Sequence, residues 1–309
     1  MTESDPTSAT TADTFDVNGR RVVVTGGTAG IGLAAAAHLV RCGARVVICG
    51  RRDEGEAIAE GIGAAFVAMD VADDSSVERA FAIVSERFDA LDALILNAGI
   101  DEYHGEIDSL DLQLFERVID VNTMGVVRTL SHGIGLVRDH GSVIVTSSPA
   151  GSVAAPGMAA YAASKAALDH LVRVWALELG PRQVRVNAVL PGIVESEMGS
   201  ESAPDLELIR RMTATGVFRK ASEMAPVFHF LVSDASAPLT GSLVGCHDGI
   251  PLGYSHEVMD HLGADLADAG GDGLWLGIWR ATSRSSQPRA APVAWARPLP
   301  GGWPRPART

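Results

Sequence analysis

Short apolar runs recur along the chain, and longer segments of helical character separate them. The runs are rich in Val and Ile and do not alternate with polar residues; they span 21–25 (RVVVT), 45–49 (RVVIC), 64–69, 91–96, 142–147 and 184–190. Runs of this kind are typical of strands buried on both faces of a parallel sheet. Their alternation with helical segments predicts a doubly wound α/β domain, in which ligands bind beyond the carboxyl ends of the strands.

The chain totals restrict the class of protein. The 309 residues are 47% hydrophobic and 20% charged, which is a globular composition that can bury a large core without disulfides. The net charge of −13 argues against nonspecific nucleic-acid binding and against anionic membrane surfaces. Three cysteines, Cys42, Cys49 and Cys246, are an odd number without metal-ligand spacing. We therefore expect reduced thiols in a cytoplasmic enzyme that neither spans nor binds a membrane.

Both ends of the chain differ in composition from the middle. Residues 1–18 are rich in Thr, Ser and Asp and lack the charged and apolar regions of a secretory signal. Residues 273–309 hold six arginines, no acid, and four of the five tryptophans. We expect a flexible segment at 1–18, a catalytic domain at 19–252, and a partly disordered extension at 253–309 that alternatively carries a partner-binding segment.

A glycine-rich turn follows the first predicted strand. Gly26, Gly30 and Gly32 are spaced G-x-x-x-G-x-G and lead into a helical stretch at 31–41. Glycines let a backbone turn tightly and approach a pyrophosphate, and the following helix offers free N–H groups and the positive end of its dipole. The turn favours nucleotide binding over an ordinary strand–turn–helix connection.

A tyrosine and a lysine lie four residues apart in an alanine-rich helical segment. Tyr161 and Lys165 therefore share one helix face. Reduction of a ketone needs a proton at its oxygen, and oxidation of an alcohol needs a base there. A free phenol has a pKa near 10, and a neighbouring cation lowers it. Taken alone, the pair is better explained by a packed tyrosine ring beside a solvated lysine.

Several ordered motifs resemble those of the short-chain dehydrogenase/reductase family. The glycine turn, TGGTAGIG, is similar to its T-G-x-x-x-G-I-G loop, and it is followed by LNAG (96–99, with Leu96 in place of Asn), DVN ending at Asn122, TSSPAG, YAASK and PG at Pro191 and Gly192. The resemblance covers about residues 19–249. It implies a Rossmann-like, mostly parallel, seven-stranded sheet with helices on both faces in a single domain, closed by a last helix and strand within 221–249.

The resemblance also implies the catalytic roles. Tyr161 is the general acid/base, and Lys165 lowers its pKa and holds the nicotinamide ribose. Ser148 bonds the substrate oxygen, because it precedes Tyr161 by the family's interval of thirteen residues, whereas its neighbour Ser147 is structural. Asn122 holds a water that relays protons from Lys165.

The implied cofactor contacts follow the carboxyl ends of the predicted strands. They are Gly26, Thr28, Gly30, Ile31, Gly32, Arg51, Arg52, Asp70, Val71, Asn97, Ala98, Gly99, Tyr161, Lys165, Pro191, Gly192, Ile193 and Ser196, the last in place of the family's Thr. Gly50 stands at the position where a carboxylate would accept hydrogen bonds from the ribose hydroxyls of NAD. Two arginines follow it. Arginine suits the 2′-phosphate of NADP, so NADP(H) is favoured over NAD(H). In the alternative, both arginines are solvated or paired with Asp53 and Glu54.

The remaining segments leave the substrate open. Residues 99–105, 149–158 and 194–217 are expected to border it, and the acids of the last segment disfavour an anion. Adjacent residues such as Cys246 and His247 seldom bind one metal, so no metal is expected. The chain is predicted to be an NADP(H)-dependent oxidoreductase acting on a carbonyl or secondary alcohol, and by analogy a homotetramer or homodimer. The alternatives are an NAD-dependent sugar, diol or steroid dehydrogenase, and a cofactor-binding regulator without turnover.

Overall fold

The computed structural model describes residues 14–102, 105–195 and 211–252. Ser196, most of the acidic 194–217 segment and the 253–309 extension lie outside the described residues. The elements are β1 (Arg21–Thr25), α2 (Gly30–Arg41), β2 (Arg45–Gly50), α3 (Gly55–Ile62), β3 (Ala65–Ala68), α4 (Asp74–Arg87), β4 (Leu91–Leu96), α5 (Leu112–Ile119), η1 (Asp120–Met124), α6 (Gly125–Gly133), β5 (Val137–Thr146), η2 (Pro149–Gly151), α7 (Ala159–Leu179), η3 (Gly180–Arg182), β6 (Arg185–Pro191), β7 (Val194–Glu195), β8 (Arg219–Lys220), α10 (Ala221–Val232), η4 (Asp234–Ser236), β9 (Leu243–Cys246) and η5 (Ile250–Leu252).

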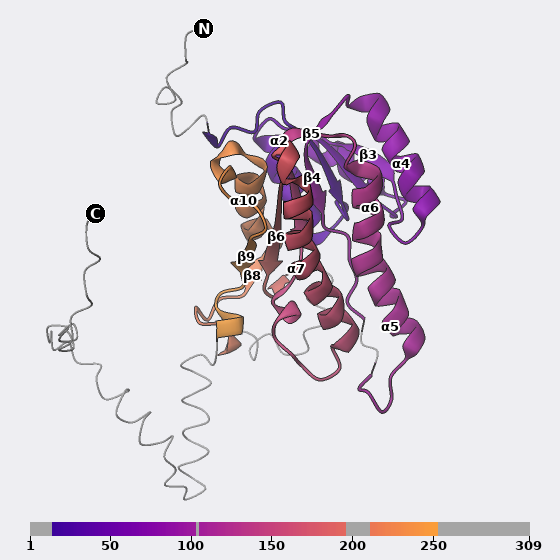
Figure 1. Cartoon of the computed structure of the whole chain (residues 1–309), viewed down its shortest axis with the longest axis vertical. Coiled ribbons are helices and arrows are strands. Elements are labelled where there is room, and N and C mark those ends of the chain that lie inside the picture. The colour runs from indigo at the N-terminus through magenta and orange to yellow at the C-terminus, as the bar shows by residue number, and fades with distance from the viewer. Residues whose placement is uncertain (1–13, 103–104, 196–210, 253–309) are drawn as a thin grey trace, which may run out of the picture. The chain divides into compact units, whose positions relative to one another are not determined.

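Seven parallel strands form the central sheet, in the order β3-β2-β1-β4-β5-β6-β9 (Figure 1). The strand order reverses between β1 and β4, which creates a crevice at the carboxyl ends of these two strands. The predicted doubly wound sheet is confirmed, including its seventh strand. The fifth strand begins earlier than predicted, at Val137, and its register against β4 shifts between Leu91 and Ala93.

Helices cover both faces of the sheet and bury alternate residues of the central strands. Val22 and Val24 of β1 pack into one apolar cluster with α2, α3 and α10, whereas Val23 packs into the other with α4, α6 and α7. Burying one such side chain stabilises the fold by about 1.5–3 kcal/mol. This two-sided burial explains why the strand runs are uniformly apolar. No helix in the described part of the chain is long and apolar enough to cross a membrane.

The α5 and α6 helices join through the π-helical turn η1 into one long helix beside the sheet (Figure 1). A π turn adds one residue to the helical repeat, and such turns are frequent at functional sites. Asn122 lies in this turn and is fully buried. The turn thus directs an amide side chain into the interior at the level of the strand ends.

Asp92 joins three central strands at their amino-terminal ends, opposite the crevice. Its Oδ2 accepts hydrogen bonds from the backbone nitrogen and Nε of Arg21 at 2.8 and 2.9 Å, and its Oδ1 lies 2.5 Å from Arg138 Nε. Burial alone would raise the pKa of Asp92, but the hydrogen bonds from Arg21 and the charge of Arg138 hold it below its usual value. The carboxylate thus fixes β1, β4 and β5, whose other ends carry the predicted site.

Asp92→Ala should lower the free energy of unfolding by about 1.5–3 kcal/mol, the range for hydrogen bonds to a charged group. Because the folded-state pKa is lowered, the stabilisation is present at neutral pH and is lost as the pH falls through that value. Urea unfolding at pH 7, and at acid pH well below the ordinary value of 3.8, measures both effects. The exposed acid Glu86 provides a control, Glu86→Ala. Equal stability of the two variants at pH 7 would contradict the assignment.

Candidate active site

A cavity of about 880 Å³ opens at the carboxyl ends of the central strands. That volume is in the range of sites for cofactors with their substrates. The predicted residues that line it are Gly26, Thr28, Gly30, Ile31, Arg51, Arg52, Asp70, Val71, Asn97, Ala98, Gly99, Ser148, Tyr161, Lys165, Pro191, Gly192 and Ile193. Gly32 and Asn122 do not line the cavity and lie behind it.

The glycine turn is packed too tightly for side chains. Gly26 has a φ of +63°, and a Cβ there would lie 2.8 Å from the Cα of Ala98. A Cβ on Gly32 would lie 2.3 Å from the carbonyl oxygen of Gly26. The turn after β1 therefore presses against the chain that leaves β4, across the point where the strand order reverses. Glycine is required at both positions by contacts within the protein itself.

The first turn of α2 faces the cavity with its amide groups. Its N-cap, Ala29, makes no side-chain hydrogen bond to the helix, and the first turn holds no acid. Ala29, Gly30 and Ile31 all line the cavity. Free N–H groups and the positive end of the helix dipole form an anion site. The turn thus fits the pyrophosphate of a dinucleotide.

The ends of β2 and β3 border the cavity beside the glycine turn. Arg51 Nη1 lies 3.8 Å from Asp70 Oδ2, and both side chains are partly exposed. The Asp70 carboxylate also accepts a hydrogen bond from the Ala72 nitrogen at 3.0 Å. A Cβ on Gly50 would lie 3.0 Å from Thr28, so a larger residue there would press on Thr28. A cationic rather than an acidic end of β2 thus faces the cavity.

Hydroxyl groups on the strands hold the segment after β4. Thr25 Oγ1 accepts hydrogen bonds from the nitrogens of Asn97 and Ala98 at 3.0 and 3.2 Å. Asn97 in turn donates to the Gly26 carbonyl and accepts from Thr146 Oγ1 at 3.1 Å. The sequence reasoning missed the roles of Thr25 and Thr146, although both stand at the ends of predicted strands.

Tyr161 and Ser148 lie next to each other in the wall of the cavity. Tyr161 lies in the first turn of α7, and Ser148 precedes the η2 turn. Burial raises the pKa of Tyr161 to about 12, a hydrogen bond with Ser148 opposes that rise, and the charge of Asp101 adds to it. A Cβ on Gly151 would lie 2.7 Å from Asp169 of α7, so the close approach of η2 to this helix requires glycine.

The direction of the Tyr161 pKa differs from the one expected from the sequence. We expected Lys165 to lower it, but in the protein alone the burial of the phenol and the charge of Asp101 raise the pKa, and only the hydrogen bond with Ser148 opposes them. The lysine ammonium lies 5.5 Å from the centroid of the Tyr161 ring. It faces the ring, where a cation is attracted to the π electrons.

Lys165 is buried, with 4% of its surface exposed. Its ammonium donates a hydrogen bond to the Thr146 carbonyl at 3.0 Å. Burial lowers the pKa of Lys165 to about 8, and the charges of Asp101 and Asp169 oppose that change. Both Ser147 and Ser148 line the cavity, but the Ser147 hydroxyl donates to Asp169 at 2.5 Å, whereas the Ser148 hydroxyl is hydrogen-bonded to Tyr161.

Asn122 connects the segment after β4 to α7. Its Oδ1 accepts from the Ile100 nitrogen at 2.8 Å, and its Nδ2 donates to the Ile100 carbonyl at 2.9 Å and to Ser164 Oγ at 3.2 Å. These contacts use both amide protons and one of the two lone pairs of Oδ1. The side chain thereby positions the cavity wall next to Lys165, and the water relay stays a prediction.

Other lining residues come from the three segments predicted to border the substrate. Asp101, Val153, Met158 and Met212 are among them. No spacing rule singled out Asp101, whose carboxylate influences both Tyr161 and Lys165. Among the described residues, one group of three potential metal ligands exists, and it lies outside this cavity.

Comparisons with known proteins agree with this geometry. A protein-family model described as enoyl-(acyl carrier protein) reductase matches residues 26–250. Short-chain dehydrogenase reductase 5 of Arabidopsis thaliana is 35% identical over 245 residues, which are 75% of this chain and 95% of the relative. The L-rhamnose 1-dehydrogenase (NAD(P)(+)) of Azotobacter vinelandii is 35% identical over 240 residues, which are 72% and 93%.

A solved structure shows the same fold. The crystal structure of a short-chain type dehydrogenase/reductase from Mycobacterium marinum superposes with a TM-score of 0.74 at 28% identity, covering 78% of this chain and 99% of that one. The matched residues include the glycine turn and the helix that carries Tyr161 and Lys165. The chain is an oxidoreductase that belongs to the short-chain dehydrogenase/reductase family.

Proposed function

We propose that the protein moves a hydride between the nicotinamide of NADP(H) and a carbonyl or secondary alcohol, with Tyr161 as the proton donor and acceptor. The observation that carries the proposal is the hydrogen-bonded pair of Ser148 and Tyr161 in the cavity wall, with the buried Lys165 ammonium beside it. The glycine turn and the free start of α2 fit a dinucleotide, which when bound supplies or accepts the hydride.

In the reducing direction, Tyr161 supplies the proton. Its raised pKa keeps the phenol protonated at neutral pH, so it is ready to donate to a carbonyl oxygen. Ser148 donates a hydrogen bond to the same oxygen and orients it. In the oxidising direction the phenolate is the base, and formation of that anion requires positive charge close to it.

Lys165 supplies part of this charge. The Thr146 carbonyl fixes its ammonium beside the phenol ring, and Asp101 and Asp169 favour its charged form. The positive charge of an oxidised nicotinamide would add to that of Lys165. Asn122 supports the pair by holding Ile100 against α7, and we assign it a positioning role.

The preference for NADP(H) rests on the arginines at the end of β2. Arg51 has more than half of its side chain exposed and pairs with Asp70 only at 3.8 Å, so a phosphate can compete for it. Its planar donor group suits a phosphate. An NAD-dependent dehydrogenase of the same fold is the second candidate, and the Asp70 carboxylate near Arg51 is the observation that favours it.

The cavity favours an uncharged substrate of partly apolar character. Val153 and Met158 line it on the side of Ser148, and Asp101 adds negative charge near Tyr161. A carboxylate in this position repels an anionic substrate. Ketones and secondary alcohols without an acid group are therefore the class to test.

Tyr161→Phe should lower kcat by about 100-fold or more, the range for loss of a general acid or base. Cofactor affinity should change little, because the ring remains. NADPH absorbance with a panel of ketones and alcohols measures turnover, and fluorescence titration measures cofactor binding. Ser85→Ala, which removes an exposed hydroxyl on α4 away from the cavity, should retain activity. Near-full activity of the Tyr161 variant would disprove the mechanism.

Lys165→Met should change the pH dependence of stability. Because burial lowers the pKa of Lys165 from 10.5 to about 8, the penalty on the buried ammonium is full below pH 8 and fades as the pH rises toward 10.5. The Tm of the wild type relative to the variant should therefore rise by about 3 °C or more between pH 7 and pH 9.5.

The chain's exposed lysine offers the matched control. Lys220→Met should give a Tm difference that does not depend on pH in this range. Parallel pH curves for the wild type and the Lys165 variant would show that the ammonium is not buried as described.

Arg51→Ala should raise KM for NADPH by about 10- to 100-fold, the equivalent of one charge-assisted hydrogen bond, and leave KM for NADH nearly unchanged. Steady-state kinetics with both cofactors measure the change. Arg79→Ala on the exposed face of α4 controls for loss of surface charge. A wild-type preference for NADH, or equal effects of Arg51→Ala on both cofactors, would defeat the assignment.

A further inference from the structure

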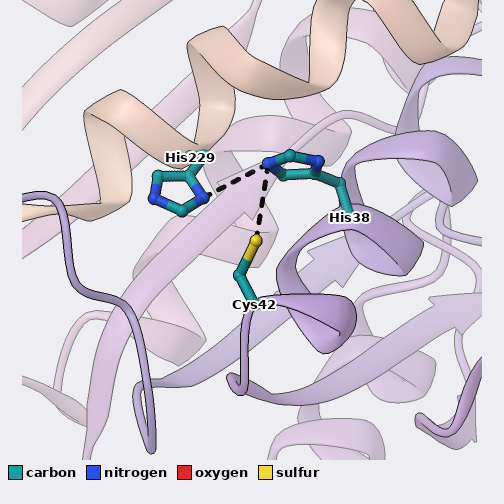
Figure 2. A group of neighbouring side chains, drawn as sticks. All are labelled: His38, Cys42 and His229. Carbon is teal, nitrogen blue, oxygen red and sulfur yellow. Dashed lines mark hydrogen bonds between the residues drawn. The ribbon is translucent and has the colours of Figure 1, made fainter.

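Three potential metal ligands gather at the end of α2 that lies farthest from the cavity. His38 and Cys42 are four residues apart on α2 and its C-cap, and His229 reaches them from α10 (Figure 2). His38 Nε2 lies 3.2 Å from His229 Nδ1 and 3.8 Å from Cys42 Sγ. All three ligand atoms lie within 4.8 Å of one another.

These separations match those around a tetrahedral zinc ion. Zn–N bonds of about 2.0–2.1 Å and Zn–S bonds of about 2.3 Å place two nitrogens about 3.3 Å apart, and a nitrogen and a sulfur about 3.5 Å apart. The observed 3.2 and 3.8 Å differ from those values by only a few tenths of an ångström, and the remaining nitrogen–sulfur pair lies within 4.8 Å. Side-chain rotations that bring this remaining pair to about 3.5 Å would place the three atoms around one ion.

A backbone contact holds His229 in the form that binds metal. Its Nε2 lies 2.7 Å from the carbonyl oxygen of Phe15, which accepts a hydrogen bond. The proton of the neutral ring is thereby placed on Nε2, and the lone pair of Nδ1 points at His38. Metal-binding histidines commonly donate their other ring nitrogen to a carbonyl in this way. The Phe15 ring packs on Phe230 at a centroid distance of 6.1 Å, which keeps the carbonyl in place.

The charges around the three ligand residues are compatible with a bound cation. Cys42 caps the carboxyl end of α2, where the unpaired carbonyls and the helix dipole favour positive charge. Arg41 opposes a cation, but its side chain is exposed and screened by solvent. The three ligand residues are half-buried, so an ion can enter from solvent.

We propose that His38, Cys42 and His229 form a site for a zinc-type divalent ion, with solvent as the fourth ligand. Two imidazoles and a thiolate are ligands that zinc and cobalt share. On binding, the Cys42 thiol releases its proton to solvent, and His38 presents the Nε2 lone pair with its remaining proton on Nδ1. Without the ion, the His38 and His229 rings share a hydrogen bond.

Such an ion would tie three separate parts of the chain together. It would join the end of α2 to α10 directly, and to the segment at Phe15 through His229. The glycine turn lies at the other end of α2, about 18 Å away at 1.5 Å per residue. The site is therefore structural, and it stiffens the helix whose first turn borders the cofactor cavity.

Cobalt titration of the chelator-treated full chain tests the site. Co²⁺ should bind at one ion per chain and give a thiolate-to-cobalt charge-transfer band that Zn²⁺ abolishes by displacement. Cys42→Ser should remove the band. His229→Gln should weaken binding by more than about 100-fold, because even loss of an outer-shell partner costs about 10- to 100-fold. Zn²⁺ should raise the Tm of the wild type and not that of either variant.

Matched controls separate this site from adventitious binding. Cys246→Ser removes a thiol elsewhere in the chain, and His170→Gln removes an exposed imidazole on α7, so both should behave as the wild type does. Circular dichroism verifies that each variant is folded. A wild-type protein without the charge-transfer band, or a band that persists in Cys42→Ser, would overturn the proposal. Neither outcome depends on the oxidoreductase activity.

Discussion

The proposed active site depends on the contacts that hold the buried ammonium group of Lys165. An ammonium group is costly to bury, and the fold compensates with the Thr146 carbonyl, two nearby carboxylates and the face of Tyr161. Here the end of β5 brings the Thr146 carbonyl to the Lys165 side chain of α7. The protein accepts a local loss of stability there, as active sites commonly do.

The surrounding structure fixes that arrangement from both ends of the sheet. At the amino-terminal ends of the strands, Asp92 fixes β1, β4 and β5 relative to one another. At the carboxyl ends of the strands, Gly26 and Gly32 allow the chain after β1 to pack closely against the chain after β4. Asn122 then joins the latter segment to α7. The cavity and the pair of Tyr161 and Lys165 are therefore parts of one packed unit.

Much of this architecture follows from local sequence, and the rest does not. The strand runs and the glycine turn are local patterns, so the parallel sheet and its crevice were predictable. The Asn122 bonds to Ile100 and Ser164 depend on a π turn that leaves no mark in residue spacing. The pKa of Tyr161 was expected to fall, but the burial of the phenol and its closeness to Asp101 are tertiary properties, and both raise that pKa. His229 meets His38 and Cys42 only because α10 packs on α2, across almost 190 residues of chain.

The most direct test of this account is an ultraviolet titration of Tyr161, obtained as the difference between wild type and Tyr161→Phe, with and without NADP⁺. In the protein alone, burial should keep the phenol protonated until the pH approaches 12. Binding of the oxidised cofactor should lower that pKa, because it adds positive charge beside a phenol already facing Lys165. A phenol that ionises near pH 10 in both states, or one that NADP⁺ leaves unchanged, would contradict the central claim.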